Sequence, residues 1–193
     1  MALLSRGARV IMLLGSLLAG ATGARAATLQ TLDGALAQAF PGARIEPRTL
    51  ALSPAEVKAV EARAHARCPA RLVTAYVAWH GDTLAGAAYT DRRVVRTREA
   101  VLLVAVAADS SVARIEVLSF FEPPDYRPPP RWLTLFAHRR EDARLAPGDA
   151  LPPLAGASLT SRAVAESARL VLAWHELLLA PLLARATHAG AAR

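Results

Sequence analysis

Residues 72–79 read Leu-Val-Thr-Ala-Tyr-Val-Ala-Trp, and a second apolar run over residues 83–89 follows after His80, Gly81 and Asp82. β-Branched and aromatic side chains are enriched in strands. A short glycine-containing loop between two such runs is typical of a hairpin. Residues 72–89 therefore predict two antiparallel strands.

A second pair of strands is predicted after the first. Residues 101–107 and 112–121 are rich in valine and other large apolar side chains, and Asp109, Ser110 and Ser111 separate them. Four strands in this up-and-down order predict an antiparallel sheet of about four strands. The arginine-rich residues 92–98 between the pairs are expected to form a solvated loop, with a phosphate or lipid contact as the less favoured alternative.

Helices are predicted on both sides of these strands. Apolar residues recur at helical spacing over 29–40, and Ser53-Pro54-Ala55-Glu56 has the cap, proline and acidic first turn that open a helix, here to about residue 66. From residue 160 or 161 a long amphipathic helix is expected to pack on the sheet until Pro181 breaks it. The predicted class is α+β, an antiparallel sheet flanked by N-terminal helices and a long C-terminal helix.

Residues 122–153 are dense in proline, which removes backbone donors and favours an extended path. A short helical stretch is expected near residues 131–138. Because long loops in compact domains are commonly binding elements and this one carries Tyr126, Trp132 and Phe136, a binding role is predicted for it.

The first 26 residues have the pattern of a signal peptide. Arg6 and Arg9 precede an apolar run over 10–21, and Ala24-Arg25-Ala26 has the form of a cleavage site. An uncleaved membrane anchor is the alternative, although the run is short for a spanning helix. The predicted organisation is a signal peptide (1–26), an N-terminal helical region (27–70), a main domain (71–185) and a frayed tail (186–193).

The bulk composition points away from several classes of protein. Of the formal net charge of +7, three positive charges lie in the leader, so the mature chain carries only +4 and has no clustered basic patch of the kind that binds nucleic acid. Cys68 is the single cysteine, so no intramolecular disulfide can form. The helix carrying His175 and Glu176 has Leu179 where a zinc protease needs its second histidine, and no metal site is expected.

A small-residue turn precedes the predicted C-terminal helix. It reads Leu-Ala-Gly-Ala-Ser-Leu-Thr-Ser over residues 154–161 and brings the hydroxyls of Ser158, Thr160 and Ser161 to the helix start. Backbone N–H groups at such a start favour a phosphate. Arg162, in the first turn, opposes the helix dipole unless an anion lies near it; otherwise it simply points into solvent.

These pieces together suit FMN, which needs a flat apolar slot for its ring, backbone groups for its pyrimidine edge and positive potential for its phosphate. Tyr126 and Trp132 are candidates for the slot, and the proline-stiffened backbone after Glu122 is the candidate for the edge. The helix start with Arg162 is the candidate phosphate site.

Residues 72–174 resemble the FMN-binding domain family, related to FMN-binding subunits of the Rnf and sodium-translocating NADH:quinone reductase complexes, in its stand-alone exported branch. The resemblance is carried by residues 72–77, 86–89, 112–126, 131–133 and 156–160 in that order. In this family the residue after Gly-Ala, usually threonine, is joined through its hydroxyl to the FMN phosphate by a flavin transferase. The cofactor contacts implied here come from Gly156, Ala157, Ser158, Leu159 and Thr160, with covalent attachment at Ser158.

Two positions depart from the family pattern. The family usually has an aspartate three residues before a serine or threonine that precedes Gly-Ala, and those places are Pro152 and Ala155 here. Covalent FMN, noncovalent FMN and a lost cofactor therefore remain three alternatives.

The resemblance implies a periplasmic electron carrier rather than a turnover enzyme. Its partners would be a membrane redox complex or another periplasmic electron-transfer protein, a flavin transferase if attachment is covalent, and no nucleic acid. The alternative is a cofactor-less assembly or binding subunit that keeps the fold. A hydrolase is a weak prediction, because no Gly-x-Ser-x-Gly elbow is present.

Overall fold

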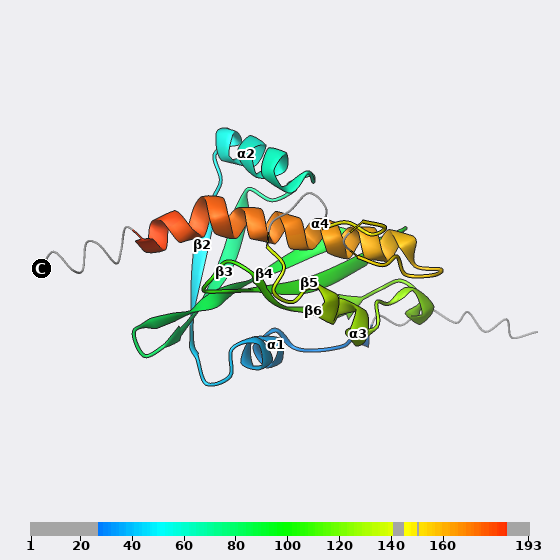
Figure 1. Ribbon diagram of the computed structural model, residues 1–193, viewed down its shortest axis with the longest axis horizontal. Coiled ribbons are helices and arrows are strands. Elements are labelled where there is room, and N and C mark those ends of the chain that lie inside the picture. The colour runs from blue at the N-terminus through cyan, green and yellow to red at the C-terminus, as the bar shows by residue number, and fades with distance from the viewer. Residues whose placement is uncertain (1–26, 141–144, 150, 185–193) are drawn as a thin grey trace, which may run out of the picture.

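Six antiparallel strands form one sheet in the order β1-β6-β5-β4-β3-β2 (Figure 1). The computed structural model describes residues 27–140, 145–149 and 151–184, so the signal peptide and the tail predicted from the sequence lie outside the described residues. The strands are β1 (Ala27–Thr28), β2 (Arg44–Ala51), β3 (Leu72–His80), β4 (Thr83–Val94), β5 (Glu99–Ala107) and β6 (Val112–Phe120).

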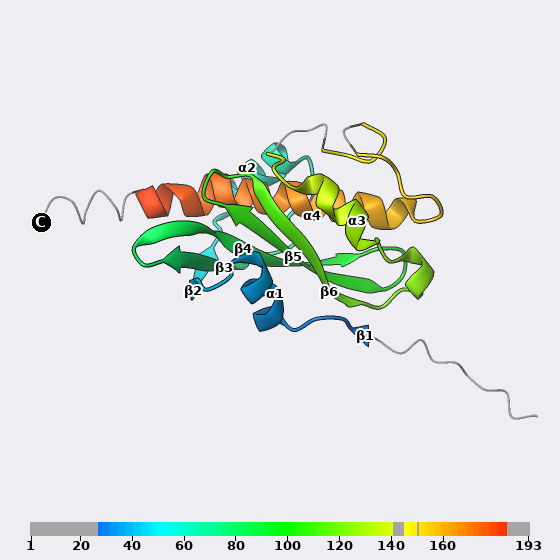
Figure 2. The ribbon, with the colours of Figure 1, turned by 60° about the horizontal axis from the view of Figure 1, so that its bottom comes forward.

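Helices cover both faces of the sheet, as Figures 1 and 2 show. One face carries α2 (Pro54–Ala64), α3 (Pro130–Leu133) and α4 (Ser158–Trp174), which share the larger hydrophobic core with it. The other face carries α1 (Leu32–Ala39) and a smaller core. Short 3-10 helices η1 (Pro124–Tyr126) and η2 (Thr134–Phe136) flank α3.

The predicted α+β class, with an antiparallel sheet and a long C-terminal helix, is confirmed. The sheet is larger than the four strands expected, because β1 and β2 come from residues 27–70, the region predicted to be helical. β2 contains Pro47 and is largely exposed, so it lacks the apolar alternation that marks a strand in sequence. Its pairing with β3 over its whole length decides its conformation.

The charged residues after Tyr89 continue the strand, so the expected loop over 92–98 is wrong for its first part. β4 runs to Val94 and β5 begins at Glu99, leaving a turn over residues 95–98. Arg93 belongs to the strand because its Nε donates to Asp91 Oδ2 at 2.6 Å, and both side chains are largely buried. A paired guanidinium can be placed in the sheet where an unpaired one would be costly.

The C-terminal helix begins two residues before Thr160, and the predicted break at Pro181 is wrong. After α4 the chain forms a single π-helical turn, η3 (His175–Leu179), and helix continues to Ala184. Within the turn the N–H of Ala180 donates to the carbonyl of His175. A proline ring normally clashes with the carbonyl four residues earlier, and the widened turn directly before Pro181 relieves that clash.

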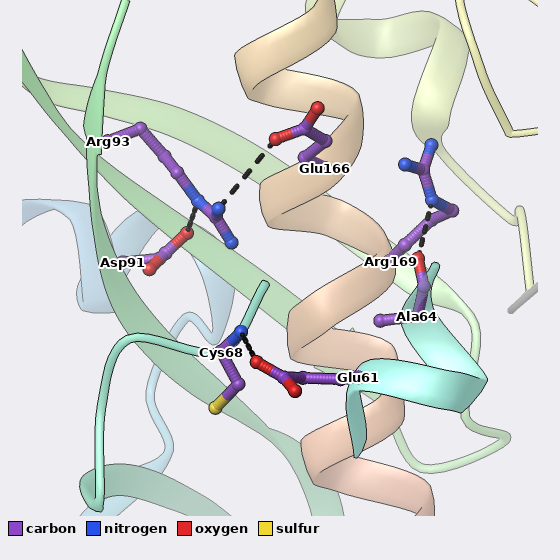
Figure 3. Close-up of polar contacts among 7 residues, drawn as sticks. All are labelled: Glu61, Ala64, Cys68, Asp91, Arg93, Glu166 and Arg169. Carbon is purple, nitrogen blue, oxygen red and sulfur yellow. Dashed lines mark hydrogen bonds and ion pairs between the residues drawn. The ribbon is translucent and has the colours of Figure 1, made fainter. Parts of the chain in front are cut away.

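Helix α4 is a core helix of the domain. The stretch Ser158–Ala184 is long and apolar enough to cross a membrane, but 56 % of its most apolar part is buried in the protein. Arg169 is buried within it and donates to the carbonyls of Ala64, at 2.8 Å, and Leu145, at 2.7 Å. The first of these bonds ties α2 to α4 (Figure 3).

Candidate functional site

The start of α4 presents backbone donors without a protein cap. Ala157 is the N-cap residue, no side chain among the described residues caps the helix, and its first turn holds no acidic residue. The first bond along the helix runs from Ser161 N to Ala157 O at 3.0 Å, so the N–H groups of residues 158–160 point out of the helix end. Such an end carries a positive partial charge that favours an anion.

A second element of the site is the turn between β4 and β5, which Glu122 organises. Its Oε1 accepts from the backbone N–H groups of Arg96 at 3.0 Å, Thr97 at 2.7 Å and Arg98 at 2.9 Å. These bonds, the one from Thr97 above all, hold the pKa of the Glu122 carboxyl below its usual value. The turn that carries Arg96 is therefore held by the segment that precedes η1.

The side chain of Arg96 lies on the ring of Tyr126, with its guanidinium carbon 4.7 Å from the ring centroid. This is the geometry of a cation–π contact. A guanidinium carries five N–H donors, so one that lies over an aromatic ring can still donate to an anion.

Arg96 and Tyr126 meet the start of α4 around one cavity of about 190 Å³. Figures 1 and 2 show that the β4–β5 turn, η1 and the beginning of α4 lie at the same end of the molecule. The cavity is lined by Arg96, Tyr126, Gly156, Ala157, Ser158, Leu159 and Thr160. Gly156 takes φ +74°, the left-handed conformation that turns the chain into the helix.

Most residues predicted to hold the cofactor are brought together here. Tyr126 and residues 156–160 all line the cavity. Ser161 does not: it is fully buried and its hydroxyl donates to the carbonyl of Ser158 at 2.9 Å. Arg162 is exposed and is not among the lining residues, in keeping with the solvent-facing alternative.

Two further predicted residues support the cavity without lining it. Glu122 anchors the β4–β5 turn rather than offering its backbone to a ligand. Trp132 is 4 % exposed, packs edge-on against Phe136, and donates through Nε1 to the carbonyl of Pro152 at 2.8 Å. It therefore fixes the segment that leads into α4 and is not a free wall for a flavin ring.

Arg96 is the cation that lines the cavity, and sequence reasoning did not single it out. It belongs to the arginine-rich residues 92–98, for which a phosphate contact was the less favoured interpretation. The local sequence does not distinguish Arg96 from the neighbouring arginines. The position of Arg96 depends on the bond from its backbone N–H to the carboxylate of Glu122, which is 26 residues away in sequence.

Replacing Glu122 by alanine is expected to lower the free energy of unfolding by about 1–3 kcal/mol, since three backbone donors lose a charged acceptor. Glu122→Gln keeps an acceptor without the charge, so its free energy of unfolding should lie between those of the wild type and of Glu122→Ala. Urea unfolding measures both. The carboxylate of Glu122 contributes its full stabilisation above pH 4.3 or so, which is about the pKa of a glutamate in the unfolded chain. This stabilisation is lost as the pH falls through the lower pKa that Glu122 has in the folded protein. An alanine variant as stable as wild type at pH 7 would contradict this role.

No protein-family model matches the chain, and no curated protein or solved structure matches it either. Within the part of the chain that the structure describes, no group of three or more His, Cys, Asp or Glu side chains is placed to hold a metal ion.

Proposed function

We propose that this protein binds FMN through its phosphate at the start of α4 and acts as an exported electron-transfer flavoprotein. The observation that carries the proposal is the position of Arg96, whose guanidinium lies over the ring of Tyr126 and which lines one cavity together with the start of α4. A guanidinium and a helix start are the two groups that most often hold phosphate in proteins.

The residues present fit the phosphate end of FMN. Gly156 and Ala157 are small, and a Cβ on Gly156 would meet nothing within 4 Å, so the helix start is open to a bulky anion. The exposed hydroxyl of Ser158 adds a donor at the same place. A cavity of about 190 Å³ suits the phosphate and its neighbouring atoms better than a whole flavin.

The flavin ring is then expected at the mouth of the cavity. Leu159 is 43 % exposed there, and Tyr126 is half-buried, so both offer apolar surface beside the phosphate position. In this proposal Leu159 and Tyr126 form the slot for the flavin ring. Trp132 is not one of its walls, because it is buried and its indole is hydrogen-bonded. A ring that stays accessible to solvent also stays accessible to a partner protein, as an electron carrier requires.

FMN supplies one- and two-electron redox chemistry when it is bound, and the chain's own part is to hold it in place. We propose a periplasmic location for this carrier, with a membrane redox complex or another periplasmic electron-transfer protein as its partner. Ser158 is exposed at the cavity and its hydroxyl can form a phosphoester, so a flavin transferase is the partner that covalent attachment would need.

Removal of the Arg96 side chain is expected to weaken FMN binding by about tenfold or more, because a charge-assisted bond to phosphate is lost. Arg96→Ala keeps the backbone bond to Glu122. Arg98→Ala, in the same turn but outside the cavity, is the matched control. Flavin fluorescence titration measures the affinities, and riboflavin, which has no phosphate, should bind both variants like wild type. Equal loss for riboflavin and FMN would argue against a phosphate contact.

Covalent attachment has its own test. After co-expression with a flavin transferase, the wild-type protein should give a fluorescent band on a denaturing gel and Ser158→Ala should not. A non-fluorescent wild-type band, with FMN still bound in the native protein, would leave the cofactor noncovalent.

The second candidate is a cofactor-less assembly or binding subunit with the same fold. It is favoured by the small cavity and by Pro152 and Ala155, which stand where the family has the acidic and hydroxyl residues of its attachment sequence. The visible spectrum separates the two: a protein that stays colourless after incubation with FMN supports this candidate, and a yellow one excludes it.

A further inference from the structure

The pairing of β3 with β4 stops before either strand ends. Its last pair on this side is Ala75 with Tyr89. Beyond it, the first residues of β3 (72–74) pair only with β2, and the last residues of β4 (90–94) pair only with β5. In Figure 1, β2 and β3 rise toward α2 at this place while β4 and β5 continue beneath α4. The sheet is therefore split, and two inner strand edges face each other.

A cavity of about 460 Å³ lies at this split. We name it the inter-strand cleft; it is lined by Pro69, Ala70, Leu72, Val73, Thr74, Thr90, Asp91, Arg92, Val94, Glu99 and Trp174. Along each edge every second residue directs its N–H and C=O toward the missing neighbour. Leu72 and Val94, at the two sides, are 68 % and 63 % exposed, which is unusual for large apolar side chains on strands.

Trp174 of α4 lines the cleft and carries a side-chain donor that no described residue uses. The residue is 1 % exposed, yet its indole Nε1 is buried without a hydrogen-bond partner among the described residues. A buried N–H without an acceptor is unfavourable, so a ligand that brings a carbonyl oxygen to it is favoured.

The charges around the cleft are already paired. Asp91 accepts from Arg93 on the neighbouring part of β4 (Figure 3), and Arg92 lies 3.1 Å from Glu99. The occupant therefore needs no net charge. It needs alternating carbonyl and N–H groups to match two strand edges, and apolar side chains to cover Leu72 and Val94.

From this arrangement we propose that the inter-strand cleft binds an extended, uncharged peptide segment of a partner protein, which pairs with the free edges of β3 and β4 and presents a carbonyl to Trp174. This is recognition by strand addition, in which main-chain bonds supply the affinity and side-chain pockets the preference. The site is separate from the flavin site proposed above, with which it shares no lining residue.

The experiment is a nitrogen–proton NMR titration of the full mature chain with an acetylated and amidated peptide of alternating threonine and valine. The chain has three tryptophans, so three indole N–H signals are expected, and Trp174→Phe identifies the one that matters. Trp132 is the internal reference, because its indole is already bonded to Pro152. The expected result is a saturable shift of the Trp174 signal and of the amides of residues 72–74 and 90–94, with the Trp132 signal unchanged.

A matched peptide with every amide N-methylated keeps its side chains but can donate no backbone hydrogen bond to either edge. It should shift none of these signals. If both peptides shift the Trp174 signal equally, the cleft recognises side chains and strand pairing is overturned. The absence of any saturable shift at millimolar peptide overturns the site itself.

Discussion

Gly86→Ala is expected to lower the free energy of unfolding by more than about 3 kcal/mol, the range of steric overpacking combined with backbone strain. A Cβ at this position would lie 2.2 Å from the carbonyl oxygen of Val106 and 2.8 Å from the ring of Phe40. The first of these atoms belongs to the backbone of β5 and cannot move without breaking the sheet. Gly86 also takes φ +153°, which side-chain-bearing residues rarely adopt.

The matched control is Gly81→Ala in the β3–β4 turn. Gly81 also has a positive φ, +59°, but an added Cβ would meet nothing within 4 Å. Its expected cost is about 1 kcal/mol, which is the backbone contribution alone. Chemical unfolding of both variants separates backbone conformation from steric contact. Equal effects at the two positions would show that the close approach to β5 is not what requires glycine.

Acidification from pH 6.5 to pH 4 is expected to remove roughly 3 kcal/mol of stability through His175. This histidine is 2 % exposed, and its Nδ1 lies 3.1 Å from the hydroxyl of Tyr89. Burial lowers the pKa of His175 to about 4 and raises the pKa of Tyr89, so a neutral phenol and a neutral imidazole share this hydrogen bond.

The sign of the pH dependence follows from which state of the protein binds the proton. Between pH 4 and about 6.5 the unfolded chain protonates this histidine and the folded protein does not, so stability is full above 6.5 and falls as pH drops toward 4. His175→Gln should flatten this slope, although it lowers stability at every pH by disturbing the bond to Tyr89. His80→Gln, at an exposed position, should keep the slope. Urea unfolding at several pH values in this interval measures how the free energy of unfolding changes with pH. An unchanged slope in His175→Gln would contradict the assignment of this pH dependence to His175.

The central sheet could be predicted because its strands carry their signal locally. β3, β5 and β6 are runs of β-branched and aromatic residues separated by turn residues, and the structure places them where the sequence does. β2 could not be predicted, since its exposed, proline-containing sequence becomes a strand only by pairing with β3. The same holds for the end of β4, where the ion pair of Arg93 with Asp91 permits charge in the sheet.

Part of the candidate site could be predicted from the sequence, and part of it could not. The helix start could be predicted because glycine, small residues and hydroxyls lie together in sequence, and residues 156–160 of this stretch line the cavity together. The arginine that lines the cavity could not be predicted, because nothing in the sequence distinguishes Arg96 from Arg162. The backbone N–H of Arg96 bonds to the Glu122 carboxylate, and this long-range contact brings Arg96 to the site. The split between β3 and β4 also has no sequence signal, since both strands continue past the point where their pairing stops.

The carboxylate of Glu122 accepts three backbone N–H groups of the β4–β5 turn, and these bonds order the turn before any ligand arrives. Ordering a loop residue costs about 1–2 kcal/mol of conformational entropy. Because Glu122 holds residues 96–98 through the protein's own bonds, this cost is met during folding rather than during ligand capture. The enthalpy of an anion contact with Arg96 would then not be offset by loop ordering, because the backbone of this turn is already preorganised.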